Sequence, residues 1–381
     1  MPATARFRPA ELSLPEKFRD LHWPFVTLIV AIGLVGYLVL YSAGGGSHEP
    51  WAWKHGLRLA LFIPLMLAVA LVDPRFWYRI AYPLYFLALA LLVAVDVLGE
   101  INKGAQRWLD LGVLQLQPSE LMKVALLLAL ARYFHSAYLS DVGRPLFLIP
   151  PLAMIAAPVA LVLIQPDLGT AVMLGASGVG LLFMGGVRIW KFLLAGGLAA
   201  AALPVAWANL HDYQRQRVYT FIDPEQDPLG TGYHIIQSKI ALGSGGFWGK
   251  GFLNGSQAQL DYLPEKQTDF AFTMLAEETG FVGAAAVLAL FLILLMLALT
   301  MAMRAPSQFT RLVAAGMVIN LTLYVCINVA MVTGLIPVVG IPLPLISYGG
   351  TAMLTSLVAA GLILGADVHR DLPMSRFPVD L

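Results

Sequence analysis

Ten apolar runs follow one another along the chain, separated by short polar breaks and one long one. They occupy residues 24–42, 57–73, 79–97, 119–134, 145–164, 169–186, 189–207, 271–301, 310–333 and 346–366. A helix needs about 20 apolar residues to cross a membrane, and these runs are apolar on all sides, which is typical of helices in lipid. No segment alternates like a membrane β-strand. The pattern predicts an all-α polytopic membrane protein with about ten transmembrane helices.

Composition supports this fold class and excludes others. The chain has 381 residues, of which 59% are hydrophobic and 12% charged, against about 25% charged in an ordinary soluble domain; a soluble enzyme is therefore excluded. The net charge of +1 provides no basic field for nucleic acid, and we expect no such partner. The sole cysteine, Cys326, rules out an intrachain disulfide, and we expect it to be small, apolar and buried.

The placement of Lys and Arg predicts how the chain is oriented, because cytoplasmic loops retain positive charge. Most of these residues fall on the cytoplasmic side if the N-terminus is inside. We expect a cytoplasmic segment at 1–23, a single transmembrane domain at 24–367 and a cytoplasmic tail at 368–381. The first run is long and lacks a clear cleavage site, so we expect a retained helix rather than a signal peptide.

The long break, at about 208–270, is predicted to be an extracytoplasmic loop between the seventh and eighth helices. A loop of this length usually has a function. We expect a short amphipathic helix at 233–242 and, after it, a glycine-rich run at 243–251. The run is not a P-loop, because Ser244 replaces the first glycine and Gly251 follows Lys250 where Ser or Thr should stand. We favour a flexible turn, with phosphate contact as the alternative.

Three carboxylates mark the start of the eighth helix. Asp269 lies at the predicted membrane boundary, and Glu277 and Glu278 follow one to two helical turns deeper. Carboxylates in the membrane are costly unless they face a polar cavity or a partner, so all three are functional candidates. Asp269 could equally be a helix N-terminal charge, worth about 0.3 to 1 kcal/mol.

Other polar residues stand near the ends of helices. Glu120 and Lys123 are i, i+3 neighbours in the fourth run, and because desolvation tends to cancel the attraction of a buried ion pair, structural pairing and a substrate-facing role both stay open. Arg107 stands beside Trp108, which could be an interfacial anchor. Asp167 lies in a tight turn between the fifth and sixth runs.

The segment 334–350 contains Pro337, Pro342 and Pro344, which prevent a continuous helix. We expect a broken or re-entrant segment that lines a cavity, with Ser347 and Tyr348 capping the last helix. Such breaks mark sites in many transporters, so transport stays open. No zinc-protease motif, nucleophile elbow or Cys/His cluster is present, which argues against covalent Ser or Cys catalysis.

Six spaced segments resemble the SEDS family (shape, elongation, division and sporulation), and most closely its rod-shape branch. The matching segments are Lys103–Trp108, Gln117–Lys123, Gln165–Thr170, Gln237–Gly246 with Gly249–Gly251, Leu263–Phe270 with Ala276–Gly280, and Pro342–Gly350. The resemblance implies a peptidoglycan glycosyltransferase that polymerises lipid II during cell elongation, at the outer face of the bacterial cytoplasmic (inner) membrane. It also implies a class B penicillin-binding protein, a transpeptidase, as partner, together with other elongation-complex proteins.

The resemblance also assigns roles to residues. Asp269 corresponds to the essential aspartate of the family, and Glu120 and Lys123 to its fourth-helix pair. Arg107, Asp167 and Lys239 match polar positions that are functionally sensitive. A divalent cation, Mg or Mn, is expected from the family alone, because no ligand set is visible in the sequence.

The expected chemistry fits these residues. Asp269 would remove the proton of the acceptor 4-hydroxyl, which attacks the donor anomeric carbon with inversion. A diphosphate leaves without protonation, so no second catalytic carboxylate is required, and Arg107, Lys123 and Lys239 are candidates to hold it. Two alternatives remain: a flippase for the lipid-linked precursor, and a non-catalytic scaffold for a penicillin-binding protein.

Overall fold

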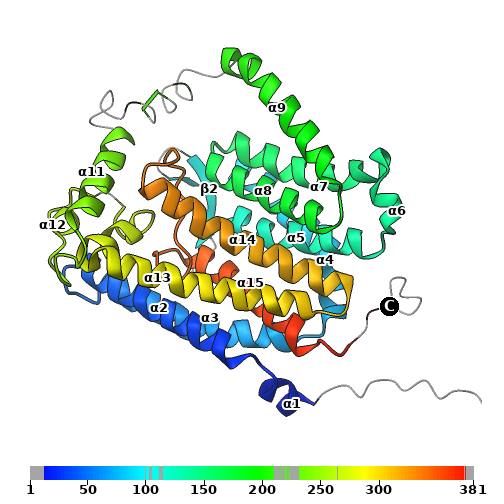
Figure 1. Cartoon of the computed structure of the whole chain (residues 1–381), viewed down its shortest axis with the longest axis horizontal. Coiled ribbons are helices and arrows are strands. Elements are labelled where there is room, and N and C mark those ends of the chain that lie inside the picture. The colour runs from blue at the N-terminus through cyan, green and yellow to red at the C-terminus, as the bar shows by residue number, and fades with distance from the viewer. Residues whose placement is uncertain are drawn as a thin grey trace, which may run out of the picture.

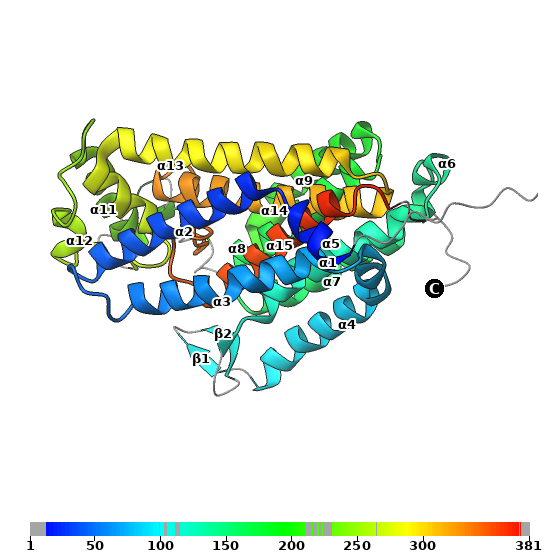
Figure 2. The ribbon, with the colours of Figure 1, turned by 90° about the horizontal axis from the view of Figure 1, so that it is seen from below.

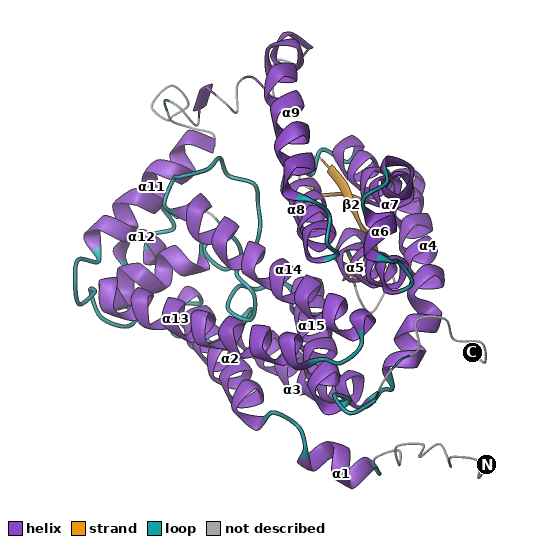
Figure 3. Cartoon of the chain, turned by 45° about the vertical axis from the view of Figure 1, so that its right-hand side comes forward, coloured by secondary structure: helices purple, strands orange, loops and turns teal. Residues whose placement is uncertain are grey.

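Helices lying side by side form nearly all of the computed structural model (Figures 1 and 3), which describes residues 13–98, 100–102, 105–110, 115–209, 215, 219–220, 223, 231–263, 265–372 and 374. Each of the ten apolar runs forms a helix, so the predicted fold class is confirmed. These helices are α2 (Trp23–Ala43), α3 (Ala52–Leu71), α4 (Pro74–Leu98), α5 (Pro118–His135), α7 (Pro145–Ile164), α8 (Leu168–Met184), α9 (Ile189–Asn209), α13 (Ala271–Arg304), α14 (Gln308–Val332) and α15 (Gly350–Val368).

Length and composition make seven of these helices able to cross a membrane: α2, α3, α4, α7, α13, α14 and α15. Helix α8 and the Ile189–Ala202 part of α9 are apolar but shorter. Helix α5 has 18 residues and includes Glu120, Lys123 and Arg132. It is nevertheless among the most buried helices, so protein rather than lipid surrounds its charges.

Three of the minor helices lie at the two ends of the bundle. Helix α1 (Leu14–Arg19) lies at one end, and α11 (Thr231–Ser244) and α12 (Ser256–Gln259) lie at the other (Figure 1); we call these the α1 end and the α11 end. The remaining minor elements are α6 (Leu139–Val142), β1 (Glu100–Asn102), β2 (Ala105–Asp110) and β3 (Gln115–Leu116). The strands form an antiparallel sheet in the order β1-β2-β3, on the side of the bundle opposite α13 (Figure 2).

Helix α14 holds the centre of the bundle, packing against α5, α8, α13 and α15. These neighbours leave one strip of α14 open, where Thr322 and Ala330 are half-buried and Cys326 is exposed. The prediction that Cys326 is buried is therefore wrong. A thiol is apolar enough to stand on such a strip of a membrane helix at little cost.

A kink divides α13 near its start. Gly280 has non-helical angles, φ 68° and ψ −166°, and a side chain there would clash, because its Cβ would lie 2.3 Å from the backbone N of Gly249. The amide of Phe281 donates to Gly246 O at 2.9 Å. The glycine-rich run therefore packs backbone to backbone against the kink.

This packing decides between the two interpretations of the glycine-rich run. The amides of Lys250 and Gly251 donate to the carbonyls of Glu277 (3.1 Å) and Glu278 (3.0 Å). Because these amides already have acceptors, the run is not arranged as a phosphate cradle. It is a turn, as we favoured, but one held in place by hydrogen bonds rather than a flexible one.

The kink also changes where Glu277 and Glu278 lie. Glu277 Oε1 accepts a hydrogen bond from Lys250 Nζ at 2.6 Å, and Glu278 Oε1 accepts one from Ser42 Oγ at 2.5 Å. Ser42 belongs to the last turn of α2, at the α11 end. The two carboxylates therefore stand in the short first part of α13, before the kink, and the long apolar part of the helix starts only after Gly280.

The proline-rich segment between α14 and α15 contains no helix in the structure, as predicted. Its backbone turns at Gly334, Gly340 and Leu345, where φ is positive. The N-cap of α15 is Gly349 and receives no side-chain hydrogen bond. Ser347 therefore does not cap α15, contrary to expectation; its hydroxyl instead accepts from the amide of Leu343 at 2.9 Å.

Candidate functional site

A cavity of about 420 Å³ lies between the sheet, α5, α14, α15 and the proline-rich segment. Its lining comprises Arg107, Trp108, Gln117, Glu120, Lys123, Asp167, Thr170, Glu265, Thr268, Asp269, Tyr324, Gly340, Ile341, Pro342, Tyr348, Gly349, Thr351 and Ala352. A second chamber of about 330 Å³ adjoins it and adds more apolar residues, including Leu168, Phe270, Val338 and Val339. Arg107, Asp167, Glu265, Asp269 and Gly340 line both chambers.

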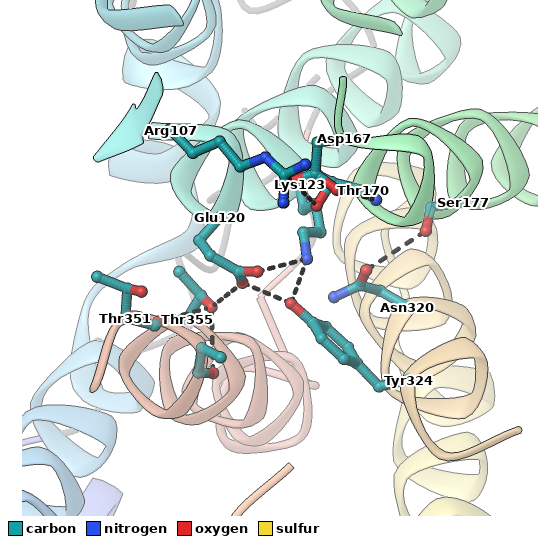
Figure 4. A network of polar contacts seen from close by, with 11 residues as sticks. Arg107, Glu120, Lys123, Asp167, Thr170, Ser177, Asn320, Tyr324, Thr351 and Thr355 are labelled. Atoms are coloured by element: carbon teal, nitrogen blue, oxygen red, sulfur yellow. Dashed lines mark hydrogen bonds and ion pairs between the residues drawn. The ribbon is translucent and has the colours of Figure 1, made fainter. Parts of the chain in front are cut away.

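A polar network formed by Glu120, Lys123, Tyr324 and Thr355 closes the floor of the cavity (Figure 4). Lys123 Nζ donates to Glu120 Oε1 at 2.7 Å and also to the hydroxyl of Tyr324. The other carboxylate oxygen, Oε2, accepts from Tyr324 at 2.5 Å and from Thr355 at 3.0 Å. Both charges are thus neutralised inside the protein, and the paired geometry expected of Glu120 and Lys123 is present.

The sequence of α5 explains why these charges stand at its start. Pro118 occupies the first turn, where a missing amide costs nothing. Glu120 is also in that first turn, where the helix dipole favours a negative charge. Lys123 follows one turn later on the same face, so the pair points into the cavity rather than toward lipid.

Arg107 and Asp167 meet at the boundary of the two chambers. Their closest atoms, Nε and Oδ2, are 3.9 Å apart. The guanidinium of Arg107 also donates to the carbonyls of Gln165 (3.3 Å) and Pro166 (2.6 Å). Asp167 is the N-cap of α8 and accepts from the amide and hydroxyl of Thr170 at 3.1 and 2.9 Å. The turn before α8 is thereby fixed against β2.

Asp269 lies in the turn that leads into α13. The N-cap of this helix is Phe270, so Asp269 does not serve as a helix cap. A side chain on Gly340 would place its Cβ 3.5 Å from Asp269 Oδ2, which shows that the proline-rich segment forms a wall beside the carboxylate. The amide of Tyr348 donates to Gln267 O at 2.7 Å and ties the two segments together.

Five of the six predicted site residues therefore converge on one cavity: Arg107, Glu120, Lys123, Asp167 and Asp269. Lys239 does not line either chamber. It is exposed on α11, with its stem against Gly334. Trp108, for which we considered an interfacial role, lines the cavity instead.

Sequence reasoning missed several lining residues. Tyr324 comes from a helix that we expected only to span the membrane. A signal was present, because Asn320, Tyr324 and Asn328 recur every four residues in an otherwise apolar run and so share one face of a helix. Glu265 lines both chambers with φ 52°, an uncommon backbone conformation for a residue other than glycine.

The described residues do not make a metal site by themselves, since no group of three or more His, Cys, Asp or Glu among them is arranged to hold an ion. The described lining of the cavity does contain four carboxylates (Glu120, Asp167, Glu265 and Asp269) against two cations (Arg107 and Lys123). A metal would therefore have to take ligands from a bound substrate as well as from the chain.

Comparison with known proteins gives consistent matches over almost the full length. Residues 19–372 match the FtsW, RodA and SpoVE family, described as a cell cycle protein. The chain is 45% identical over 356 residues to the peptidoglycan glycosyltransferase MrdB of Escherichia coli strain K12, covering 92% of this chain and 95% of that protein.

Two solved structures share the fold. One is a chain from a structure described as "Structural coordination of polymerization and crosslinking by a peptidoglycan synthase complex". It aligns with a TM-score of 0.79 and 34% identity, covering 94% of this chain and 99% of that one. The other, the rod shape determining protein RodA of Thermus thermophilus, aligns with a TM-score of 0.70 and 30% identity over 93% and 98% of the two chains.

Proposed function

We propose that this chain, which belongs to the FtsW, RodA and SpoVE family, is a peptidoglycan glycosyltransferase that joins lipid II disaccharides into β-1,4 glycan strands during cell elongation. The 45% identity to a peptidoglycan glycosyltransferase over most of both chains supports the activity. The observation that carries the proposal is the cavity on which Asp269, Arg107, Asp167, Glu120 and Lys123 converge. Such convergence is unnecessary in a scaffold.

Asp269 is the proposed general base. It lines both chambers, so an acceptor in one chamber and a donor in the other would meet beside its carboxylate. The carboxylate takes the proton of the acceptor 4-hydroxyl as the oxygen attacks the anomeric carbon of the donor. The bond from that carbon to the diphosphate breaks, the configuration inverts, and the lipid diphosphate leaves with the electron pair.

Arg107 is the proposed contact for the leaving diphosphate. Its side chain is 32% exposed at the boundary of the chambers, whereas Lys123 is 3% exposed and already bonded to Glu120 and Tyr324. Lys123 therefore acts on substrate mainly by shaping the floor, and Lys239 would contact a lipid-linked substrate only outside the cavity. The excess of carboxylates favours a divalent cation that enters with the diphosphate, which omission of Mg and Mn from a polymerisation assay tests.

The chemistry takes place at the external end of the bundle in this proposal. The apolar helices make the chain a multi-pass membrane protein. We place the α11 end outside the cytoplasmic membrane and both termini inside, as the distribution of basic residues favours. The resemblance to a peptidoglycan synthase complex supports a partner that crosslinks the glycan, which we take to be a class B penicillin-binding protein.

The deciding experiment compares polymerisation of lipid II by the purified wild-type chain, alone and with its partner, against Asp269→Asn. We expect Asp269→Asn to abolish glycan formation without changing thermal unfolding, because the amide cannot accept the hydroxyl proton. Asp261→Asn is the matched control, since Asp261 lies eight residues earlier with an 82% exposed side chain and should retain full activity.

The same preparations separate the competing functions. Full polymer yield from Asp269→Asn would disprove the role of Asp269. Absence of glycan from the wild type together with lipid II translocation in liposomes would identify a flippase, and absence of both would identify a scaffold.

A further inference from the structure

Asn328 lies on α14 one helical turn beyond Tyr324, and its side chain is completely buried. Its amide nitrogen, Nδ2, donates two hydrogen bonds to backbone carbonyls. One acceptor is Asp269 O at 2.9 Å, and the other is Ile341 O at 2.7 Å. A single side chain thus connects the turn that carries the proposed base to the proline-rich segment that forms the wall beside it.

An amide is the neutral side-chain group that fits the chemistry of this contact. Two carbonyls that converge on one atom need a group with two N–H donors, which an amide provides and a hydroxyl or a carboxylate does not. The orientation of the amide follows, because the reverse orientation would place its oxygen against two carbonyl oxygens.

The arrangement is a poor choice for stability alone. Asn328 Oδ1 is buried without a hydrogen-bond partner among the described residues, and an unsatisfied buried acceptor costs about 1–3 kcal/mol. An apolar residue would avoid that cost but could not hold the two carbonyls. A buried, half-satisfied amide therefore indicates that this residue positions the two backbone segments rather than adding packing energy.

We call the two hydrogen bonds of Asn328 Nδ2 the clamp. The neighbouring contacts show what the clamp controls. Asp269 precedes the N-cap of α13, so its backbone is not part of the helix. Its turn is tied to the proline-rich segment by the bond from Tyr348 N to Gln267 O, and Gly340 lies against its carboxylate. Asn328 contacts the backbone of Asp269 itself, through the bond from Nδ2 to Asp269 O.

We propose that Asn328 is a positioning residue for glycosyl transfer, holding Asp269 in register with the proline-rich wall so that the carboxylate faces both chambers. It does not touch substrate. The proposal rests on the proposed function for its kinetic consequence, but the clamp itself can be measured without activity.

The test compares Asn328→Leu, which removes both donors, with Asn328→Asp, which keeps the shape of the side chain and, when protonated, one O–H donor. Asn320→Leu is the matched control, because Asn320 is also buried on α14, two turns away, and its side chain contacts Ser177 rather than Asp269. The full-length variants are assayed for lipid II polymerisation with kcat and KM determined separately. Hydrogen exchange is followed in peptides that cover residues 265–270 and 341–348.

We expect kcat of Asn328→Leu to fall about 10- to 100-fold, the effect of a misplaced catalytic group, with KM changed less than about threefold. The kcat of Asn328→Asp should fall between those of Asn328→Leu and the wild type. Amides at 265–270 should exchange faster in both Asn328 variants and at the wild-type rate in Asn320→Leu.

Wild-type kcat and unchanged exchange in a folded Asn328→Leu would overturn the proposal, as would an equal loss in Asn320→Leu. If Asn328→Leu does not fold, Asn328→Asp decides: reduced kcat with faster exchange at 265–270 supports the clamp, and wild-type values refute it. Absence of glycan from the wild type would instead refute the proposed function, while the exchange data still judge the clamp.

Discussion

At the scale of single residues, the buried charges of α5 are balanced by partners on other helices. The side chains of Lys123 and Glu120 are 3% and 5% exposed, and Tyr324 and Thr355 donate to the one Glu120 oxygen, Oε2, to which Lys123 does not. Removing one partner of a buried pair leaves an uncompensated charge, which costs about 3–5 kcal/mol. Single and double variants of this pair can therefore distinguish a structural role from contact with substrate.

Lys123→Met should lower the free energy of unfolding by about 3–5 kcal/mol, and the double variant Lys123→Met with Glu120→Gln should recover most of it. Thermal unfolding of both proteins in detergent measures this difference. If the double variant regains stability but not polymerisation, the pair also serves substrate; if it regains both, the pair is structural. A single variant as stable as the wild type would contradict the burial of the pair.

Residue identity revealed part of this site before its geometry was known. Charged residues are scarce in an apolar chain, so Arg107, Glu120, Lys123, Asp167 and Asp269 could be selected from the sequence. The neutral members, such as Tyr324, could not be selected as readily, because tyrosine is ordinary in a membrane helix and only its contact across the bundle gives it a role.

At the scale of elements, the glycines at the α11 end join two segments that are distant in sequence. Gly249 and Gly280 both have positive φ, at 82° and 68°, and a Cβ on either would lie within 2.6 Å of backbone atoms of the other. The helical period of α13 contains no sign of this kink, which is why the sequence predicted an uninterrupted apolar run at 271–301.

Gly280→Ala should lower the free energy of unfolding by about 1–3 kcal/mol, the cost of a strained backbone. The added methyl group also collides with the glycine-rich run, which increases the loss. The midpoint of thermal unfolding measures the loss. Gly243→Ala is the control, since Gly243 is helical and has open space around its Cα, and it should be neutral or slightly stabilising. Equal midpoints for the two variants would refute the packing at the kink.

At the scale of the whole molecule, hydrophobic length alone predicted ten helices correctly, because lipid requires backbone hydrogen bonds to be satisfied within each segment. It could not predict the shape of the bundle. Helix α9 projects from the other helices (Figure 3), and α5 is enclosed by them, yet both are simply apolar runs in the sequence.

The proposed orientation predicts which sites are accessible from outside the cell. In a Cys326→Ala background, Trp248→Cys should react with a membrane-impermeant maleimide in intact spheroplasts, because Trp248 follows the last residue of α11 by four positions and is 76% exposed. Ser13→Cys, beside α1, should react only after permeabilisation. Labelling of the two positions in the reverse order would invert the proposed topology.

One face of α14 carries both Tyr324, which belongs to the floor of the cavity, and Asn328, which contacts the turn of Asp269. Tyr324 bonds to the floor and Asn328 to the turn of Asp269, about 6 Å apart along the axis of a helix that rises 1.5 Å per residue. A rigid rod cannot move one of these contacts without the other. Any displacement of α14 along or about its axis would therefore move the floor contact and the contact with the turn of Asp269 together.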